Sequence, residues 1–227
     1  MKPETVGKQI AFSVPMVQAI LNNHKCQTRR IVRDVPAEAR HAITIDGKFV
    51  WLNSFMDSIG YTFDCPYGRE LSMLYLREDF RVSSFYDRMQ PSQVPAEVEV
   101  HYEADGYPSA RFGRARECRY MMRWMSRITL QIKSLRIERL QDISDGDCIL
   151  EGITPADVEL ASKYMEELPA LGQVTLRGNT PPRWAYAKLW EKIHGAGSWQ
   201  INPFVWVIEF DHQHGNIDEI LAQQEEA

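Results

Sequence analysis

The sequence predicts an α+β protein in which a small mixed β-barrel is flanked by helices. The expected elements run strand, helix, several strands, two helices and a final strand. Helices that do not alternate regularly with strands argue against a doubly wound parallel sheet. The length of 227 residues suits one large domain, or one domain with insertions. We expect a single domain over residues 1–211, with insertions at about 34–69, 104–120 and 154–180, followed by a polar tail over 212–227.

A strand and a short helix are predicted near the N-terminus. Gln9–Phe12 favours a strand, and Ser13 then suits a helix N-cap with Pro15 in the first turn. Asn22-Asn23 suits the exit from a helix, so the helix is expected to end there. Its apolar residues recur on one helical face: Met16, Val17, Ile20 and Leu21.

The first insertion is predicted to hold a hairpin, and four further strands are predicted after it. The hairpin joins Ala42–Ile45 to Phe49–Leu52 through a turn at Asp46-Gly47. The other strands have either a continuous apolar run or alternating polar and apolar residues. They are Leu71–Arg77, Glu97–Glu103, Ser126–Glu138 and Phe204–Phe210.

Two clear helices, and a third inside an insertion, are predicted in the C-terminal half. Ser144 suits an N-cap with Asp147 three residues later, and Gly152 suits the helix exit. Glu151 is therefore expected in the last turn of a short helix. The polar tail from His212 is expected to form at most a marginal helix. The two other helices are expected over 155–166, inside a weakly structured insertion, and between Thr180-Pro181 and Gly195.

The composition is typical of a soluble globular protein, with 44% hydrophobic and 25% charged residues. No run approaches the ~18 apolar residues of a membrane span. The N-terminus lacks the apolar core of a signal peptide, which favours the cytoplasm. The cysteines are far apart and form no CxxC pair, so we expect free thiols, no metal and no cofactor. They are Cys26, Cys65, Cys118 and Cys148.

One stretch is strongly basic although the chain as a whole is acidic. Between Arg111 and Arg139 nine basic residues are opposed only by Glu117 and Glu138, which gives this stretch a charge of about +7. Since the whole chain carries −5, the remainder carries about −12. The stretch suits contact with RNA phosphates or, alternatively, a solvated loop and strand face. Its basic residues are Arg111, Arg114, Arg116, Arg119, Arg123, Arg127, Lys133, Arg136 and Arg139.

The most informative short segment is Lys25-Cys26-Gln27-Thr28-Arg29-Arg30. A lysine three residues before a threonine can place a base beside a nucleophile. Neighbouring arginines suit an anionic or planar polar ligand. Cys26 and Gln27 are interpreted as spacing. One alternative is that Lys25 and Thr28 form a solvated helix exit. Another is that Arg29 and Arg30 form ordinary salt bridges.

Four motifs, in the order in which they occur along the chain, resemble those of the ASCH domain. This domain is a member of the PUA-like superfamily of RNA-associated β-barrels. The resemblance spans residues 9–210. Tracts similar to Trp124–Leu130 and Gly197–Phe210 also occur in phage- and prophage-encoded ASCH-like proteins. The four motifs are Lys25-x-x-Thr28-x-Arg30 after a strand and helix, Glu78 after the strand Leu71–Arg77, Glu151-Gly152 at a helix end, and the final strand Val205–Phe210.

The resemblance implies an amidohydrolase that cleaves N4-acetylcytidine to cytidine and acetate. Members with this activity have a catalytic lysine and threonine in the same motif and a glutamate at the end of the helix after a central strand. These residues match Lys25, Thr28 and Glu151, and the motif's arginine matches Arg30. Free lysine titrates near 10.4, so such a site must lower its pKa. The expected substrate-binding residues are Arg29, Arg30, Glu78, Trp124 and Trp199.

A second hypothesis is a non-catalytic module that binds RNA or a modified base. A phosphate backbone would use the basic stretch, which a nucleoside enzyme does not need. The expected partners are thus a small nucleoside, or RNA through Arg111–Arg139, and no membrane. Two structural alternatives stay open at this point. In the first, Glu151 is a solvent-facing residue in the last turn of its helix. In the second, the tryptophans Trp124, Trp199 and Trp206 are core residues rather than platforms on which a base stacks.

Overall fold

The computed structural model describes residues 7–167 and 180–225 and shows an α+β protein, as expected. The chain divides into two compact units. Unit 1 contains Met1–Asn22, Cys65–Ser134 and Phe210–Ala227, and unit 2 contains Asn23–Asp64 and Leu135–Glu209.

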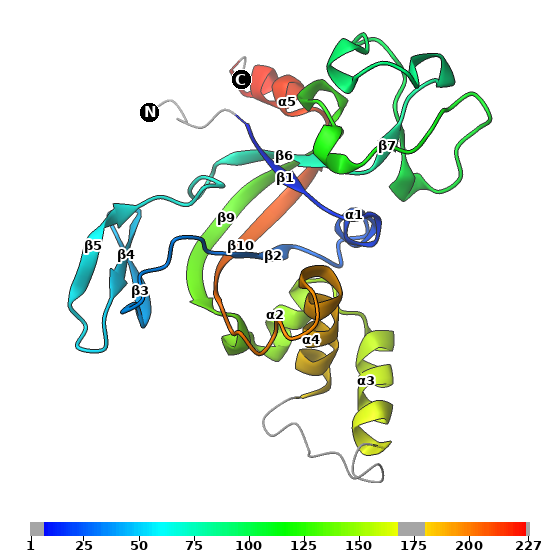
Figure 1. The fold of residues 1–227 in the computed structure, drawn as a ribbon. Coiled ribbons are helices and arrows are strands. Elements are labelled where there is room, and N and C mark those ends of the chain that lie inside the picture. The colour runs from blue at the N-terminus through cyan, green and yellow to red at the C-terminus, as the bar shows by residue number, and fades with distance from the viewer. Residues whose placement is uncertain (1–6, 168–179, 226–227) are drawn as a thin grey trace. The chain divides into compact units, whose positions relative to one another are not determined.

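A mixed five-stranded sheet has the order β1-β6-β9-β10-β2 (Figure 1). In unit 1, β1 (Lys8–Ala11) lies parallel to β6 (Met73–Arg77), and β6 pairs antiparallel with β9 (Ile128–Arg139). In unit 2, β10 (Phe204–His214) pairs antiparallel with β2 (Gln27–Ile31). Strands β9 and β10 each have residues in both units. The mixed character of the sheet therefore agrees with the prediction.

The described strands do not form the closed barrel that the sequence predicts. Closure would require a ladder between β1 and β2, the two ends of the strand order. Among the described strands no such ladder is formed. Strand β2 itself was not among the predicted strands, because its residues are mostly polar.

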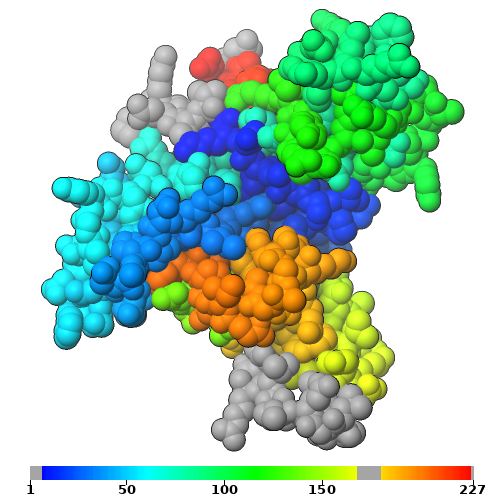
Figure 2. Space-filling view, in the orientation of Figure 1, coloured from blue at the N-terminus to red at the C-terminus, as the bar shows by residue number. Residues whose placement is uncertain are grey.

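Unit 1 contains, besides its part of the sheet, α1 (Val14–Leu21), α5 (Ile217–Glu225) and the two-stranded ladder β7 (Phe80–Arg81) with β8 (His101–Tyr102). The residues between β7 and β9 form a continuous surface, coloured green in Figure 2. Short 3-10 turns shape this segment: η1 (Ser84–Tyr86), η2 (Pro91–Gln93), η3 (Glu103–Asp105), η4 (Cys118–Tyr120) and η5 (Arg123–Met125).

The strand predicted over Glu97–Glu103 is mostly wrong, since only His101–Tyr102 pairs as β8. The N–H of Val98 donates to the carbonyl of Pro95, which closes a turn where the strand was expected. The alternation of Val98, Val100 and Tyr102 has another cause. All three side chains pack against one apolar cluster that includes Phe80 and Val82.

Unit 2 contains a three-stranded antiparallel sheet of β3 (His41–Ile45), β4 (Lys48–Leu52) and β5 (Ser58–Phe63). The predicted hairpin is confirmed, with positive φ angles of 50° at Asp46 and 76° at Gly47 that suit a two-residue turn. Strand β5 was not predicted. The ring of Phe49 packs edge-on against Trp206 of β10, with centroids 4.8 Å apart.

The helices of unit 2 are α2 (Asp145–Leu150), α3 (Pro155–Glu167) and α4 (Pro181–His194), with a 3-10 turn η6 (Leu140–Asp142) before them. These three helices lie together in Figure 1. All three begin and end close to the predicted positions. The apolar core of unit 2 joins α2, α3 and α4 to β10, and it includes Cys148, Ala161, Tyr186, Trp190, Val205 and Val207.

The C-terminal segment is more ordered than the predicted polar tail. Strand β10 extends to His214, and α5 follows it. Ile217 and Ile220 of α5 are buried against Met73 of β6. The segment is therefore part of the core of unit 1.

We expect the substitution Ile217→Ala to lower the free energy of unfolding by about 2–5 kcal/mol, because it removes a buried branched side chain and leaves a cavity. Glu219→Ala, at an exposed position of the same helix, is the matched control and should change stability by less than about 0.5 kcal/mol. Urea unfolding followed by circular dichroism measures both. Equal stabilities of the two variants would show that α5 does not contribute to the core.

Candidate functional site

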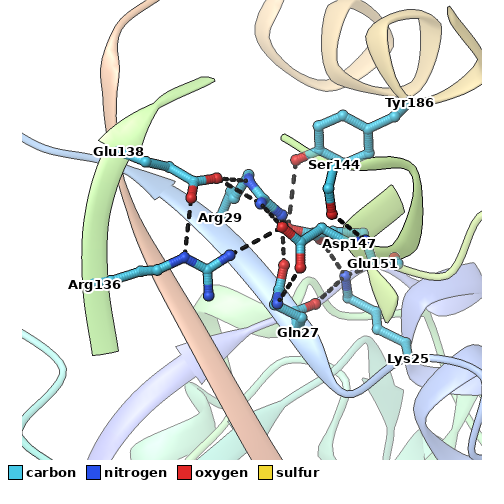
Figure 3. A network of polar contacts seen from close by, with 9 residues as sticks. All are labelled: Lys25, Gln27, Arg29, Arg136, Glu138, Ser144, Asp147, Glu151 and Tyr186. Carbon is cyan, nitrogen blue, oxygen red and sulfur yellow. Dashed lines mark hydrogen bonds and ion pairs between the residues drawn. The ribbon is translucent and has the colours of Figure 1, made fainter. Parts of the chain in front are cut away.

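A buried cluster of charged and polar side chains lies in unit 2, where β2, β9, α2 and α4 contribute residues (Figure 3). It contains three cations, three carboxylates, an amide and a phenol. Buried charges are rare unless they are paired, so a cluster of this size requires a reason. Its members are Lys25, Gln27, Arg29, Arg136, Glu138, Asp147, Glu151 and Tyr186.

Glu151 is placed by the end of helix α2. Ser144 caps the helix start by accepting a hydrogen bond from the N–H of Asp147, as predicted. At the other end, the N–H of Ile153 donates to the carbonyl of Cys148 and that of Gly152 to Ile149. This Schellman pattern needs a positive φ, which Gly152 supplies at 99°. The carboxylate of Glu151, at the C-cap, is thereby directed inward.

Lys25 lies opposite this helix end and is 1% exposed, while Glu151 is 4% exposed. The Nζ of Lys25 lies 2.6 Å from Oε2 of Glu151 and 2.8 Å from the Glu151 backbone carbonyl. It also lies 2.8 Å from the carbonyl of Gln27. The N–H of Cys26 donates to the carbonyl of Leu150, which fixes this segment against the helix. Three acceptors around one amine match the three donors of an ammonium group.

Arg29 occupies the centre of the cluster. Gln27 and Arg29 are two positions apart in β2, so their side chains leave the same face of the strand. The guanidinium of Arg29 donates through Nη1 to Gln27 (2.6 Å) and to Glu151 (3.1 Å). Through Nη2 it reaches Glu138 (2.6 Å) and Asp147 (3.1 Å). One arginine therefore binds three carboxylates.

The outer part of the cluster is less buried. Arg136 donates to Glu138 at 2.9 Å and to Asp147 at 3.0 Å. The amide of Gln27 donates to Asp147 at 3.0 Å. With Lys25 protonated, the three cations balance the three carboxylates.

Burial changes the pKa of several members. Loss of hydration lowers the pKa of Lys25, although Glu151 acts in the opposite direction. Burial also opposes the charge on Arg29, but Glu151 and Glu138 outweigh it and raise the pKa of that group. Burial, followed by the charge of Glu151, raises the pKa of Tyr186 well above its usual value. Its hydroxyl lies 3.4 Å from Oε1 of Glu151 and stays a proton donor.

The structure brings together two of the three predicted catalytic residues, Lys25 and Glu151. The alternatives of a solvated helix exit and a solvent-facing Glu151 are wrong, because the side chains of Lys25 and Glu151 are buried. The salt-bridge alternative holds for Arg29, which forms ion pairs with three carboxylates. Thr28 is buried too, but it alternates with Gln27 and Arg29 along β2 and leaves the opposite face. Within the described part of the chain, no hydrogen bond joins the Thr28 hydroxyl to Lys25 or Glu151.

The predicted substrate-binding residues are dispersed. Arg29 is in the cluster, whereas Arg30 alternates with it along β2, and its charge, after burial, lowers the pKa of His194. Trp199 is buried in the core of unit 2, with its ring 6.2 Å from that of Tyr186. Trp206 is buried in β10. The core alternative thus holds for these two tryptophans.

The remaining two candidates belong to unit 1. Glu78 is buried and bound by the guanidinium of Arg127 at 2.9 and 3.1 Å. Burial is the main cause that raises its pKa. Trp124 is half-buried against the apolar cluster around Phe80. Their roles in binding substrate stay predictions.

The sequence did not single out Gln27, Glu138, Asp147 and Tyr186 as site residues. The interpretation of Gln27 as spacing is wrong, since both ends of its amide are hydrogen-bonded in the cluster. Recognition of residues 27–31 as a strand would have placed Gln27 and Arg29 on one face. No comparable signal in the sequence marks Glu138 or Tyr186.

Most of the basic stretch is paired with acids. Six of its nine residues form ion pairs. Two more, Arg116 and Arg139, donate to backbone carbonyls. The paired residues are Arg111 with Glu99, Arg119 with Glu117, Arg123 with Asp218, Arg127 with Glu78 and Asp105, Lys133 with Asp211, and Arg136 with Glu138 and Asp147.

The described residues show neither a metal-binding cluster nor a membrane-spanning helix. Over residues 7–167 and 180–225, no group of three or more histidine, cysteine, aspartate or glutamate side chains is arranged to hold a metal ion. In the same ranges, no helix is long and apolar enough to cross a bilayer. Comparison with known proteins found no relative, because no family model, curated protein or solved structure matches the chain.

We expect Arg29→Met to lower the free energy of unfolding by about 3–5 kcal/mol, because it leaves three carboxylates without their shared cation. Arg33→Met, at an exposed position of the same unit, is the matched control and should have little effect. Thermal or urea unfolding of the two variants measures the difference. A loss below about 1 kcal/mol in Arg29→Met would mean that Arg29 is not central to the stability of unit 2.

Proposed function

We propose that this protein is an amidohydrolase that cleaves the N4-acyl amide of an acylated cytosine nucleoside, within a PUA-like fold of the ASCH type. The observation that supports it most is the direct contact between Lys25 and Glu151, 126 positions apart in the chain. The motif resemblance implied that these two residues act together. Their contact in a buried environment is what an acid–base pair requires.

The contact supplies a way to form a base and an acid together. A proton passes from the ammonium of Lys25 across 2.6 Å to Oε2 of Glu151, which leaves a neutral amine and a carboxylic acid. Burial favours the neutral pair, and loss of hydration lowers the pKa of Lys25 in that direction. The number of protons in the site does not change.

The neutral amine of Lys25 then takes the proton of the nucleophile, which is a water molecule or the hydroxyl of Thr28. In the structure Thr28 leaves the opposite face of β2, so its hydroxyl has to turn toward Lys25 before it can attack or hold that water. The nucleophile's oxygen bonds to the acyl carbon and forms a tetrahedral oxyanion. As the C–N4 bond breaks, the carboxylic acid of Glu151 gives its proton to N4. Lys25 is again an ammonium and Glu151 a carboxylate. If Thr28 is the nucleophile, water repeats the sequence on the acyl ester and releases the carboxylic acid.

The other members of the cluster position this pair. Arg29 holds Oε1 of Glu151, so that Oε2 is the oxygen that faces Lys25. Tyr186 contributes a neutral hydroxyl close to the same Oε1. Arg30, or the backbone N–H groups beside it, is proposed to stabilise the oxyanion.

The alternative of a non-catalytic RNA-binding module is less well supported. Its main argument was the charge of the basic stretch, yet six of these nine side chains are engaged by carboxylates. At Arg123, Arg127 and Arg136, whose side chains are less than half exposed, a phosphate backbone would have to displace these carboxylates. In contrast, a module that only contacts phosphates through its surface does not require a buried acid–base pair.

We expect the wild-type protein to release acetate from N4-acetylcytidine, and Lys25→Ala to lower turnover at least about 10³-fold, because the base is lost. The change in ultraviolet absorption on deacylation measures the rate. Lys163→Ala, which alters an exposed lysine, is the matched control and should retain full activity. Lys25→Met provides a second test if the alanine variant does not fold. Full turnover in either folded Lys25 variant, or none in the wild type, would exclude the proposed function.

The identity of the nucleophile has its own test. If the hydroxyl of Thr28 attacks, we expect Thr28→Ala to lose at least about 10²-fold in turnover and Thr28→Ser to keep most of it. In single-turnover experiments, mass spectrometry of the wild type should then detect an acylated Thr28. Turnover of Thr28→Ala near that of the wild type would assign the attack to water.

A further inference from the structure

Unit 1 has a pocket of about 730 Å³ that neither the proposed reaction nor the sequence motifs explain. Its volume is in the range of sites for small molecules, about 300–1,000 Å³. Its lining comes from β1, β6 and the segments that contain η2, η4 and η5. The side chains that matter for its chemistry are Gln9, Tyr75, Arg77, Arg119, Tyr120 and Arg123.

The pocket lining carries three arginines and no acidic residue. Two of the arginines have carboxylate partners outside the lining. Arg123 is bound by Asp218, and Arg119 forms a solvent-exposed pair with Glu117. Exposed pairs are weak, so Arg119 is available to a ligand with little loss.

Arg77 differs from both because its guanidinium contacts only neutral acceptors. Its Nε donates to the carbonyl of Cys118 at 2.8 Å, and its Nη1 donates to Oε1 of Gln9 at 2.5 Å. Arg77 is 9% exposed, and no described carboxylate lies within ion-pair distance of it. A buried cation without a counter-charge is unfavourable, so the site favours an anion beside it. A guanidinium is suited to a phosphate or carboxylate, which it binds through two N–H groups.

The same pocket offers aromatic surface and amide donors. Tyr120 is 49% exposed, with Arg119 against its ring at 4.9 Å. Tyr75 donates its hydroxyl to Oε1 of Gln9, the atom that also accepts from Arg77. Because Oε1 is occupied twice, the Nε2 group of Gln9 is left to donate to a ligand. A ligand with an anionic group and a planar ring would use all of these features.

We propose that this pocket binds a nucleoside monophosphate, with the phosphate on Arg77 and Arg119 and the base against Tyr120. Stacking on an exposed tyrosine tolerates every base, so we expect little selectivity among the four nucleotides. The site lies in unit 1 and uses none of the residues of the Lys25 cluster. The proposal therefore does not depend on the proposed hydrolase activity.

Isothermal titration calorimetry of the full chain with adenosine and cytidine monophosphates tests the proposal. We expect both nucleotides to bind at least tenfold more tightly than adenosine, cytidine or inorganic phosphate. Equal affinity for nucleosides and nucleotides would overturn the role of Arg77. Tighter binding of a 5′-phosphorylated RNA decamer than of the mononucleotides would overturn the free nucleotide as the ligand.

Three variants distinguish the contacts to the phosphate from the contact to the base. Arg119→Ala should weaken mononucleotide binding several-fold, and Arg77→Lys should weaken it at least tenfold because the two-pronged contact is lost. Tyr120→Ala should weaken mononucleotide binding about tenfold and leave inorganic phosphate binding unchanged. Arg114→Ala, an exposed arginine outside the pocket, is the matched control.

Since Arg77 also holds Cys118 and Gln9, melting temperatures accompany the titrations. Arg119→Ala and Tyr120→Ala change exposed side chains, so they keep the proposal testable if Arg77→Lys does not fold. If neither of these two variants changes mononucleotide affinity, the proposed site is wrong. If Arg114→Ala weakens binding as much as Arg119→Ala, the binding is nonspecific and the proposal fails.

Discussion

The ion pair between Lys25 and Glu151 is the interaction on which unit 2 depends. Both groups are almost fully removed from water, and an isolated charge in such a place would be unfavourable by several kcal/mol. The pair persists because each oxygen of Glu151 has a cation, Lys25 on one and Arg29 on the other. Since Arg29 also binds Glu138 and Asp147, the end of β9 and both ends of α2 are bound to one guanidinium.

The position of Glu151 at the end of a helix is a further reason why its carboxylate needs a cation beside it. A carboxylate at a helix C-terminus meets the negative end of the helix dipole, which disfavours its charge. Lys25 compensates twice, because its amine binds both the carboxylate of Glu151 and the backbone carbonyl of the same residue. The lysine thus caps helix α2 while it neutralises the side chain. Burial lowers the pKa of Lys25 and the charge of Glu151 raises it, so this amine is suited to exchange a proton, which is the property that the proposed reaction uses.

The parts of the fold that could be predicted are those in which apolar periodicity or capping residues mark an element. Helix α2 is an example, because Ser144 and Gly152 mark its ends and thereby locate Glu151. Strand β2 could not be predicted, because its buried residues Gln27, Thr28 and Arg29 are polar, and no hydrophobic pattern reveals them. The opposite error occurs at Val98 and Val100, where alternation reflects packing on a cluster without a β ladder. Periodicity therefore reports burial, and it reports a strand only when hydrogen-bond partners exist.

The charge of a sequence segment likewise does not predict the charge of the surface that the segment forms in the folded protein. Counted along the sequence, Arg111–Arg139 is a basic stretch, but several of its acidic partners come from outside it, for example Asp218 for Arg123 and Glu78 for Arg127. These acids lie 95 and 49 positions away, so no short window of the sequence contains both members of either of these two pairs. Arg77 is the converse case: it lies outside the basic stretch and beside Glu78 and Asp79, yet it contacts only neutral acceptors. A buried cation that lacks a counter-charge after folding indicates a ligand better than any count of charges before it.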